Sequence, residues 1–183
     1  DKKVVIEDLN EDLEEFRVNN KAVYLSKFHT CETRIASRLK LLVRTPKSIR
    51  EVDAEKAVEW VQQQLSIQLA ERQVEAVKSA LESKAMTITG GPGTGKTTII
   101  NAILRIYSTL RVRIMLAAPT GRAAQRMGEV IGKPAKTIHR LLGWKAGGFK
   151  RNEESPLKTD FLVVDECSML DITLTAALLK AVP

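Results

Sequence analysis

The chain has 183 residues, 44% of them hydrophobic and 28% charged, and its formal net charge is +7. A chain of this length can bury one good-sized hydrophobic core, or one domain with a small appendage. It contains no apolar stretch near the length of a membrane span, no signal peptide and no cysteine pair at metal-ligand spacing, so we expect a cytoplasmic α/β protein with no membrane partner.

The basic charge lies outside the first fifteen positions. Residues 1–15 hold seven acids and two lysines, and the rest of the chain carries 27 basic against 15 acidic residues. A basic field of this size favours a polyanion as the partner of the protein.

The N-terminal quarter of the chain predicts a small, mainly helical region. Residues 9–44 indicate two short helices around a short extended piece at 22–25, and Ile35, Leu39 and Leu42 share one face of the second helix. The sequence Thr-Pro-Lys-Ser at 45–48 interrupts this pattern and has the composition of a linker. We therefore expect an upstream region with its linker at 1–48 and a second domain at 49–183.

Helical patterns at about 53–65 and 70–81 lead to a hydrophobic strand and a phosphate-binding loop. The sequence GGPGTGKT at 90–97 matches the P-loop pattern, and a helix is expected from about 95 to 110. A ligand-free Gly-rich turn is the alternative, which the strand before the loop and the helix after it disfavour. The predicted nucleotide-binding residues of this loop are Gly91, Gly93, Thr94, Gly95, Lys96, Thr97 and Thr98.

Each residue type in this loop has a chemical reason. Glycines let successive backbone N–H groups curl around phosphates, and the positive end of the following helix dipole lies beneath the anion. Lys96 is expected to neutralise the β- and γ-phosphate oxygens, which makes it a catalytic residue as well as a binding residue. The Thr97 hydroxyl is expected to ligate Mg²⁺.

The rest of the chain predicts a parallel sheet with crossover helices. A strand at 114–118, a helix, a loop and an apolar run at 161–164 follow the P-loop helix. The run ends in Asp165 and Glu166, at the strand end where ligands of such sheets bind. Asp165 is placed to hold Mg²⁺ through water, and Glu166 to orient and deprotonate an attacking water. A solvated strand end is the alternative for these two acids.

A basic segment lies between these two strands. Residues 130–152 contain six lysines and arginines and no acid, interleaved with Trp144 and Phe149. Cations suit the phosphates of a single nucleic-acid strand, and aromatic rings suit its bases. A solvated loop is the alternative interpretation of this segment.

Five sequence blocks follow one another between about 69 and 170. They are LAERQVEAV (69–77), the P-loop, AAPTGRAA (117–124), KTIHRLL (136–142) and VVDECSM (163–169). In this order they resemble superfamily-one helicases, and their RecD-like branch in particular. The segments 22–25 and 31–39 resemble the region upstream of the motor in stand-alone RecD-like helicases.

This resemblance implies a RecA-like P-loop motor domain at 49–183, with ATP and Mg²⁺ as cofactors. It implies that Gln73 recognises adenine, which a side-chain amide can do because it offers a donor and an acceptor. It also implies contacts to single-stranded DNA from Thr120, Arg122, Thr137, His139 and Arg140. Alternatives remain open: Gln73 as a surface glutamine, Thr120 as a helix N-cap and His139 as a structural histidine.

The implied activity is ATP-dependent 5′-to-3′ DNA unwinding, coupled to translocation on single-stranded DNA, in DNA repair or recombination. The implied partners are single-stranded DNA, a second motor domain of the same parent chain, and recombination or repair proteins. The chain ends before the second motor domain of such a helicase, so we expect the first motor domain to be C-terminally incomplete and the isolated chain to be a weak or inactive ATPase. The alternative is an ATP-binding DNA-clamp or switch module without helicase activity. A GTP switch is disfavoured, because no Asn-Lys-x-Asp block is present.

Overall fold

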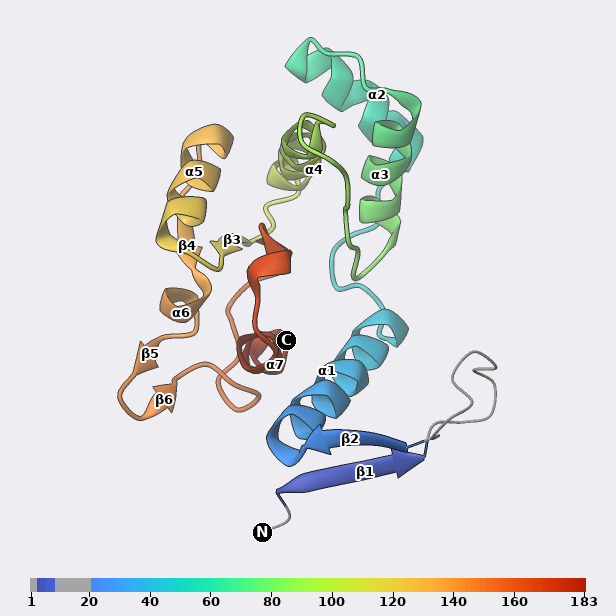
Figure 1. Cartoon of the computed structure of the whole chain (residues 1–183). Coiled ribbons are helices and arrows are strands. Elements are labelled where there is room, and N and C mark those ends of the chain that lie inside the picture. The colour runs from blue at the N-terminus through green and yellow to red at the C-terminus, as the bar shows by residue number, and fades with distance from the viewer. Residues whose placement is uncertain (1–2, 9–20) are drawn as a thin grey trace.

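The computed structural model describes residues 3–8 and 21–183. Figure 1 shows its elements. They are β1 (Val4–Asp8), β2 (Lys21–Leu25), α1 (Ser26–Arg44), α2 (Ala54–Leu65), α3 (Glu71–Glu82), α4 (Lys96–Thr109), β3 (Ile114–Ala118), α5 (Gly121–Ile131), β4 (Ala135–Thr137), α6 (Ile138–Leu141), β5 (Trp144–Lys145), β6 (Gly148–Phe149), β7 (Phe161–Val164), the 3₁₀ helix η1 (Cys167–Met169) and α7 (Ile172–Ala181). None of the helices in these ranges is long and apolar enough to cross a membrane.

A parallel sheet of three strands, in the order β4-β3-β7, forms the centre of the larger part. β3 pairs with β7 over four residue pairs that begin at Ile114↔Phe161. On its other side β3 pairs with β4 over three residue pairs that end at Ala118↔Thr137. Parallel neighbours need crossover connections, and α5 lies in the connection from β3 to β4. The predicted α/β fold with a parallel sheet and crossover helices is confirmed.

Helices cover both faces of this sheet. On one face, Leu116 of β3 packs with Leu104 of α4 and Met127 of α5. On the other face, Ala117 packs in a cluster formed with α6 and α7, which includes Ile138. Successive residues of a strand point to opposite faces, so a strand covered on both sides needs a continuous apolar run. The sequence IMLAA of β3 is such a run.

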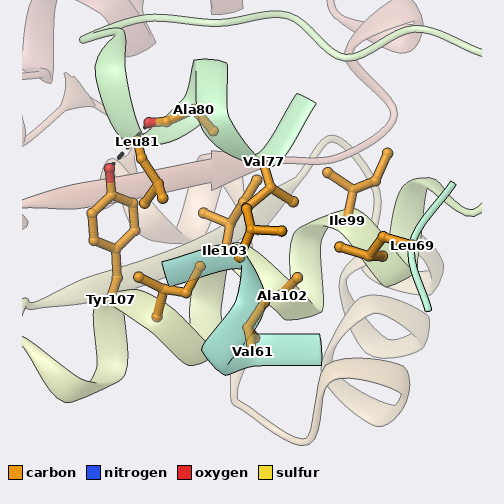
Figure 2. Packing of buried hydrophobic residues seen from close by; sticks show 11 residues of the cluster. Val61, Leu69, Val77, Ala80, Leu81, Ile99, Ala102, Ile103 and Tyr107 are labelled. Atoms are coloured by element: carbon orange, nitrogen blue, oxygen red, sulfur yellow. Dashed lines mark hydrogen bonds between the residues drawn. The ribbon is translucent and has the colours of Figure 1, made fainter. Parts of the chain in front are cut away.

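The helices α2, α3 and α4 share a second apolar core, which Figure 2 shows. Val61 of α2, Val77 of α3 and Ala102 of α4 are fully buried in it. The Tyr107 hydroxyl donates to the Ala80 carbonyl oxygen at 3.1 Å and so ties the last turn of α4 to that of α3. Burial raises the pKa of Tyr107. The first residues of β3 and β7 also pack against this core, which joins the helical layer to the sheet.

The N-terminal part is an antiparallel ribbon of β1 and β2 followed by α1. β2 contains the extended piece predicted at 22–25, and α1 agrees with the helix predicted after it. On the predicted apolar face of that helix Leu42 is buried and Ile35 half-buried, but Leu39 is exposed. The first helix predicted within 9–44 falls on 9–20, outside the described residues. β1 was not predicted, because it lies within the acidic segment that carries no clear alternation.

The strand predicted immediately before the P-loop is not part of the sheet. Residues 86–91 have no helix or strand assignment, and no backbone hydrogen bond joins them to a strand in the described ranges. Ile88 packs against the core of α2, α3 and α4, whereas Met86 is exposed. An extended segment that buries one apolar side chain against helices has the same short pattern as a ladder strand, so this prediction was wrong.

The segment between α5 and β7 was predicted as a loop and contains regular structure. β4 pairs with β3, α6 follows directly, and β5 and β6 form a short antiparallel hairpin. Leu142 and Leu157 from this segment are buried in the cluster on the α6 and α7 face of the sheet. Strands of two and three residues are too short to show a period of two, which is why the pattern did not reveal them.

Candidate nucleotide and nucleic-acid site

The P-loop turns directly into α4. Gly95, the N-cap residue of α4, has φ +81°, and Gly93 has φ +74°. Both values lie in the left-handed region, which glycine enters without the steric penalty that a Cβ atom brings. The cap uses no side chain. The first N–H groups of α4, which have no acceptor within the helix, therefore stay available to an anion held by the loop.

The Lys96 side chain folds back over the loop. Its ammonium nitrogen Nζ donates to the carbonyl oxygens of Gly90 at 2.6 Å and Gly91 at 2.7 Å. The Thr94 hydroxyl donates to the same Gly91 oxygen at 2.9 Å. A Cβ atom at Gly90 would lie 2.7 Å from the Thr94 Oγ1, so the turn requires glycine there. The loop thus holds the Lys96 ammonium group against its own backbone, and a cation beside backbone N–H groups is the chemistry of a triphosphate site.

Gln73 lies against the P-loop, as its predicted role in nucleotide binding requires. It sits in the first turn of α3, where its Oε1 accepts from the Ala70 amide at 3.0 Å. Its Nε2 donates to the Thr94 carbonyl oxygen at 3.2 Å. A Cβ atom at Gly95 would approach that nitrogen to 2.3 Å, so a larger residue at 95 would displace the Gln73 amide from the loop.

The residues predicted to hold Mg²⁺ offer hard oxygen donors. Thr97 lies in the first turn of α4 with its side chain exposed, and Asp165 follows β7. No group of three or more His, Cys, Asp or Glu side chains in the described ranges could hold a metal ion alone. Mg²⁺ in nucleotide sites uses one or two protein oxygens and completes its shell with phosphate and water. A hydroxyl and a carboxylate therefore fit this cation.

The acid pair lies at the carboxyl end of β7. The Asp165 amide donates to the Ala117 carbonyl oxygen at 3.0 Å, which extends the ladder with β3, and the Asp165 Oδ1 accepts from the Glu166 amide at 2.9 Å. Glu166 is exposed and has φ +54°, a strained conformation for a residue with a side chain. Strained residues of this kind cluster at functional sites. No hydrogen bond or ion pair in the described part of the chain joins Lys96 to either acid.

Cys167 follows the acid pair and is exposed. Its Sγ donates to the Val164 carbonyl oxygen at 3.3 Å. Desolvation of the sulfur and the negative charge of Asp165 raise the pKa of this thiol. A neutral thiol is a poor nucleophile and a poor metal ligand.

The residues predicted to contact DNA lie at the carboxyl ends of β3 and β4. The register Ala118↔Thr137 places the two strand ends side by side. Thr120 caps α5 by accepting from the Ala123 amide, and Thr137 caps α6 by accepting from the Arg140 amide, both at 3.2 Å. The N-cap alternative for Thr120 is therefore correct, and a cap does not prevent the hydroxyl from facing a ligand. The cations Arg122, Lys136 and Arg140 of these blocks are exposed.

His139 belongs to an aromatic cluster with the β5–β6 hairpin. Its ring centroid lies 6.2 Å from that of Trp144 and 5.8 Å from that of Phe149, and the last two rings are 4.8 Å apart. Trp144 is 55% exposed. The sequence predicted an interleaving of aromatic and basic residues, but not that a hairpin would gather the rings. One of the six cations is structural, because the Arg151 Nη1 donates to the Ser155 Oγ and the Pro156 carbonyl oxygen.

Comparisons with known proteins agree with this arrangement. The family model described as AAA domain matches residues 73–183. The ATP-dependent RecD2 DNA helicase of Deinococcus radiodurans is 38% identical over 162 residues, which cover 88% of this chain and 22% of that protein. The RecBCD enzyme subunit RecD of Mycobacterium tuberculosis is 38% identical over 136 residues, covering 61% of this chain and 24% of the relative.

A third relative comes from a virus. The ATP-dependent DNA helicase dda of Enterobacteria phage T4 is 37% identical over 117 residues, which cover 58% of this chain and 27% of the phage protein. The chain thus spans about a quarter of the length of these curated relatives. The family match covers the P-loop, the acid pair, and the blocks at 117–124 and 136–142, which we call the strand-end blocks because they lie at the ends of β3 and β4. The resemblance to RecD-like superfamily-one helicases is confirmed, and the chain belongs to the AAA domain family.

Proposed function

We propose that residues 49–183 form the first motor domain of an ATP-dependent DNA helicase that moves 5′ to 3′ along single-stranded DNA. The observation that supports this proposal best is the register of the sheet. Ala117↔Val164 and Ala118↔Thr137 bring the ends of β7, β3 and β4 to one edge. The acid pair and the two basic strand-end blocks therefore share that edge, where nucleotide chemistry and DNA contacts can be coupled.

In the nucleotide half of this site, each side chain has a defined task. Gln73 reads the adenine edge from the first turn of α3, and Lys96 moves from the loop carbonyls to the β- and γ-phosphate oxygens. Thr97 and Asp165 would hold Mg²⁺, which supplies neutralisation of phosphate charge. Glu166 orients a water molecule and accepts its proton.

In the nucleic-acid half, exposed cations and backbone amides meet the DNA phosphates. Arg122 lies in the first turn of α5 beside amides that lack acceptors within the helix. Thr137, His139 and Arg140 follow β4, and Trp144 and Phe149 offer rings on which bases stack. Binding through phosphates and stacking is tolerant of sequence, as translocation along a strand requires.

The whole protein would also use a second motor domain. Arginines supplied by another domain stabilise the transferring phosphate and raise hydrolysis rates by about 10³- to 10⁵-fold in related P-loop enzymes. We therefore propose that the chain by itself binds ATP and hydrolyses it slowly. Closing and opening of two motor domains around ATP would move the strand-end blocks along DNA. We further propose a role in DNA repair or recombination, which the similarity to the RecD2 DNA helicase and to the RecBCD enzyme subunit RecD supports.

The test is steady-state ATP hydrolysis by this chain and by a longer version that includes a second motor domain, each with and without a single-stranded oligonucleotide. We expect turnover mainly in the longer protein, stimulated by DNA. If both proteins bind ATP, neither hydrolyses it and DNA has no effect on turnover, the chain is an ATP-dependent clamp or switch and the helicase proposal is wrong.

A further inference from the structure

Two cations from the segment upstream of the motor domain donate hydrogen bonds to the C-terminal ends of α7 and α3. The first is Arg38 of α1, which is half-buried. Its Nη2 donates to the Val182 carbonyl oxygen at 2.6 Å and its Nε to the Leu179 carbonyl oxygen at 3.2 Å. Both oxygens lie at the C-terminal end of α7, where carbonyls lack partners within the helix and the helix dipole is negative. Figure 1 shows α1 lying beside α7.

The second cation is Lys47, in the linker between α1 and α2. Its Nζ donates to the Leu81 carbonyl oxygen in the last turn of α3. Lys47 is half-buried, although its neighbours Pro46 and Ser48 are exposed. Within a linker, a lysine that is turned inward onto a helix end has a defined position, and it repeats the chemistry that Arg38 uses on α7.

The opposite ends of these two helices border the nucleotide site. Gln73, in the first turn of α3, donates to the Thr94 carbonyl oxygen of the P-loop. α7 begins at its N-cap Asp171, only five residues after Glu166, and η1 fills the interval. At a rise of about 1.5 Å per residue, helices of this length are roughly 15 to 18 Å long. The upstream segment thus holds both helices at the ends distant from the nucleotide.

We propose that residues 26–48, comprising α1 and the linker, form a brace that sets the spacing of α3 and α7 and thereby positions Gln73 and the acid pair around the nucleotide. This inference rests on the proposed nucleotide site. Arg38 and Lys47 are positioning residues that act through α3 and α7. Packed helices move as stiff bodies, because interiors are close-packed and low in compressibility, so a shift at one end of a helix is transmitted to the other.

The brace explains why two cations donate hydrogen bonds to carbonyl oxygens at helix ends, although water could donate to the same oxygens. If Arg38 only stabilised the end of α7, no similar contact on α3 would be needed. Both α3 and α7 are capped, and the opposite ends of both helices border the nucleotide site. The core of α2, α3 and α4 and the cluster around α7 are separate. The strands β3 and β7 contact both of them, and the segment with Arg38 and Lys47 adds a second connection, at the C-terminal ends of α3 and α7.

The experiment uses Arg38→Ala and Lys47→Ala, with Arg34→Ala and Arg50→Ala as controls. Arg34 lies one turn before Arg38 on α1 and Arg50 lies three residues after Lys47, and both are exposed. The first measurement is hydrogen exchange at the amides of Val74, Met169 and Thr175, which donate to carbonyls at the near ends of α3, η1 and α7. The second is the Kd for MgATP by titration of the chain.

If the brace exists, exchange at these three amides becomes faster in both variants, and the Kd for MgATP rises roughly two- to tenfold. Arg34→Ala and Arg50→Ala leave both values unchanged. Arg38→Lys and Lys47→Arg, which keep a cation at each position, restore part of the protection and affinity; they also serve as the test variants if the alanine variants do not fold.

A purely stabilising role for the caps gives a different result. Exchange would then increase only at the far ends, at the amides of Val182 and Ser83, with a lower melting temperature and an unchanged Kd; that result overturns the proposal. If the unsubstituted chain does not bind MgATP at all, the proposed function fails, and near-end exchange still decides whether the brace exists.

Discussion

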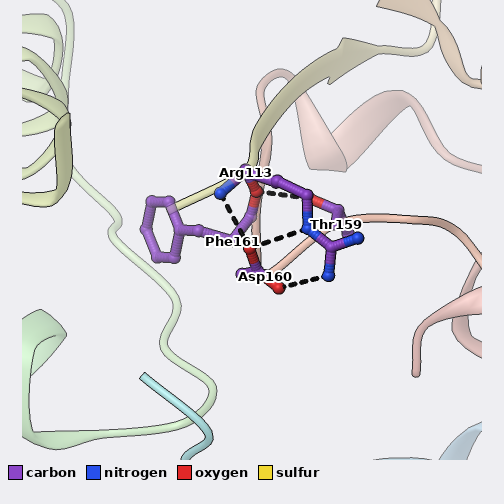
Figure 3. Close-up of polar contacts among 4 residues, drawn as sticks. All are labelled: Arg113, Thr159, Asp160 and Phe161. Carbon is purple, nitrogen blue, oxygen red and sulfur yellow. Dashed lines mark hydrogen bonds and ion pairs between the residues drawn. The ribbon is translucent and has the colours of Figure 1, made fainter. Parts of the chain in front are cut away.

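Arg113 and Asp160 form a two-point ion pair where β3 and β7 begin, as Figure 3 shows. The Arg113 Nη2 lies 2.6 Å from the Asp160 Oδ1, and its Nε lies 2.9 Å from the Oδ2. The backbones are also joined, because the Asp160 amide donates to the Arg113 carbonyl oxygen at 2.9 Å. This clip lies immediately before the register that starts at Ile114↔Phe161, at the ends of both strands opposite to the candidate site.

The first prediction concerns pH. Hydrogen bonds from Arg113 lower the pKa of Asp160 from 3.8 to about 2. A carboxyl whose pKa is lower in the folded than in the unfolded state stabilises the fold above its unfolded pKa, and this contribution disappears as the pH falls through about 2. The measurement is the urea midpoint of the wild type and of Asp160→Asn between pH 6 and pH 2. We expect a lower midpoint for the variant near neutral pH.

The difference between the two proteins should shrink as the pH falls below about 4. Lys56→Ala is the control, because it removes an exposed pair with Asp53 on α2 that contributes little. A midpoint difference that stays constant down to pH 2 would show that the charge of Asp160 does not stabilise the fold.

The second prediction concerns Thr159, which is buried beside the clip. Its hydroxyl lies 3.0 Å from the Arg113 carbonyl oxygen and 2.9 Å from that of Phe161. Thr159→Val keeps the shape and removes the donor, so we expect the free energy of unfolding to fall by about 1 to 2 kcal/mol. Thr109→Val, at the exposed end of α4, is the control. Equal losses in both variants would contradict a special role of Thr159 at the strand start.

The strands differ in how far their sequences revealed them. β3 and β7 were predicted because a strand covered on both faces is a continuous apolar run. β4 was not, because three residues that include Lys136 show no pattern. The strand predicted before the P-loop was wrong, since Ile88 is half-buried against helices rather than paired within a ladder. Short apolar runs do not distinguish these two environments.

The parts of the site that are formed by neighbouring residues in the sequence were predicted. Contacts between residues far apart in the sequence were missed. The P-loop and its helix follow from a contiguous pattern that glycines at 93 and 95 satisfy. The resemblance implied adenine recognition by Gln73, which stays a prediction, and the contact of its Nε2 with the Thr94 carbonyl oxygen was not predicted. The cap of Arg38 on Val182 joins positions 144 residues apart, and a contact of that kind leaves no mark in a single sequence. The assignments of the DNA-contacting residues stay predictions.

The third prediction separates the two roles of Gln73. If its amide reads adenine, Gln73→Ala weakens ATP binding by about tenfold and reduces the preference for ATP over GTP. If it only caps α3 and supports the P-loop, both nucleotides lose affinity equally. The measurement is a competition titration of the chain with ATP and GTP. Gln63→Ala, an exposed glutamine of α2, is the matched control and should change neither affinity.

The fourth prediction distinguishes binding from chemistry. Lys96→Ala removes the cation that we propose binds the β- and γ-phosphates, so we expect loss of MgATP binding or of turnover. Glu166→Gln keeps the shape and removes the base, so ATP should bind normally while kcat falls by about 10²- to 10⁴-fold. Equilibrium binding and single-turnover hydrolysis, in the version with the second motor domain, give the two values. A Glu166→Gln protein with normal kcat would refute the assignment of the base.

The fifth prediction tests the aromatic cluster as a stacking surface for DNA. Trp144 is 55% exposed in the cluster with Phe149 and His139, and Trp144→Ala should weaken binding to single-stranded DNA by about 1 to 3 kcal/mol. Because stacking carries no charge, the slope of log K against log salt should stay unchanged in this variant.

Arg140→Ala should instead reduce that slope by about 0.7, the value for one phosphate contact on a single strand. Fluorescence anisotropy at several salt concentrations measures both effects, and Met86→Ala, an exposed apolar residue before the P-loop, is the control. A cluster that only supports the fold would leave DNA affinity unchanged in Trp144→Ala while lowering the melting temperature.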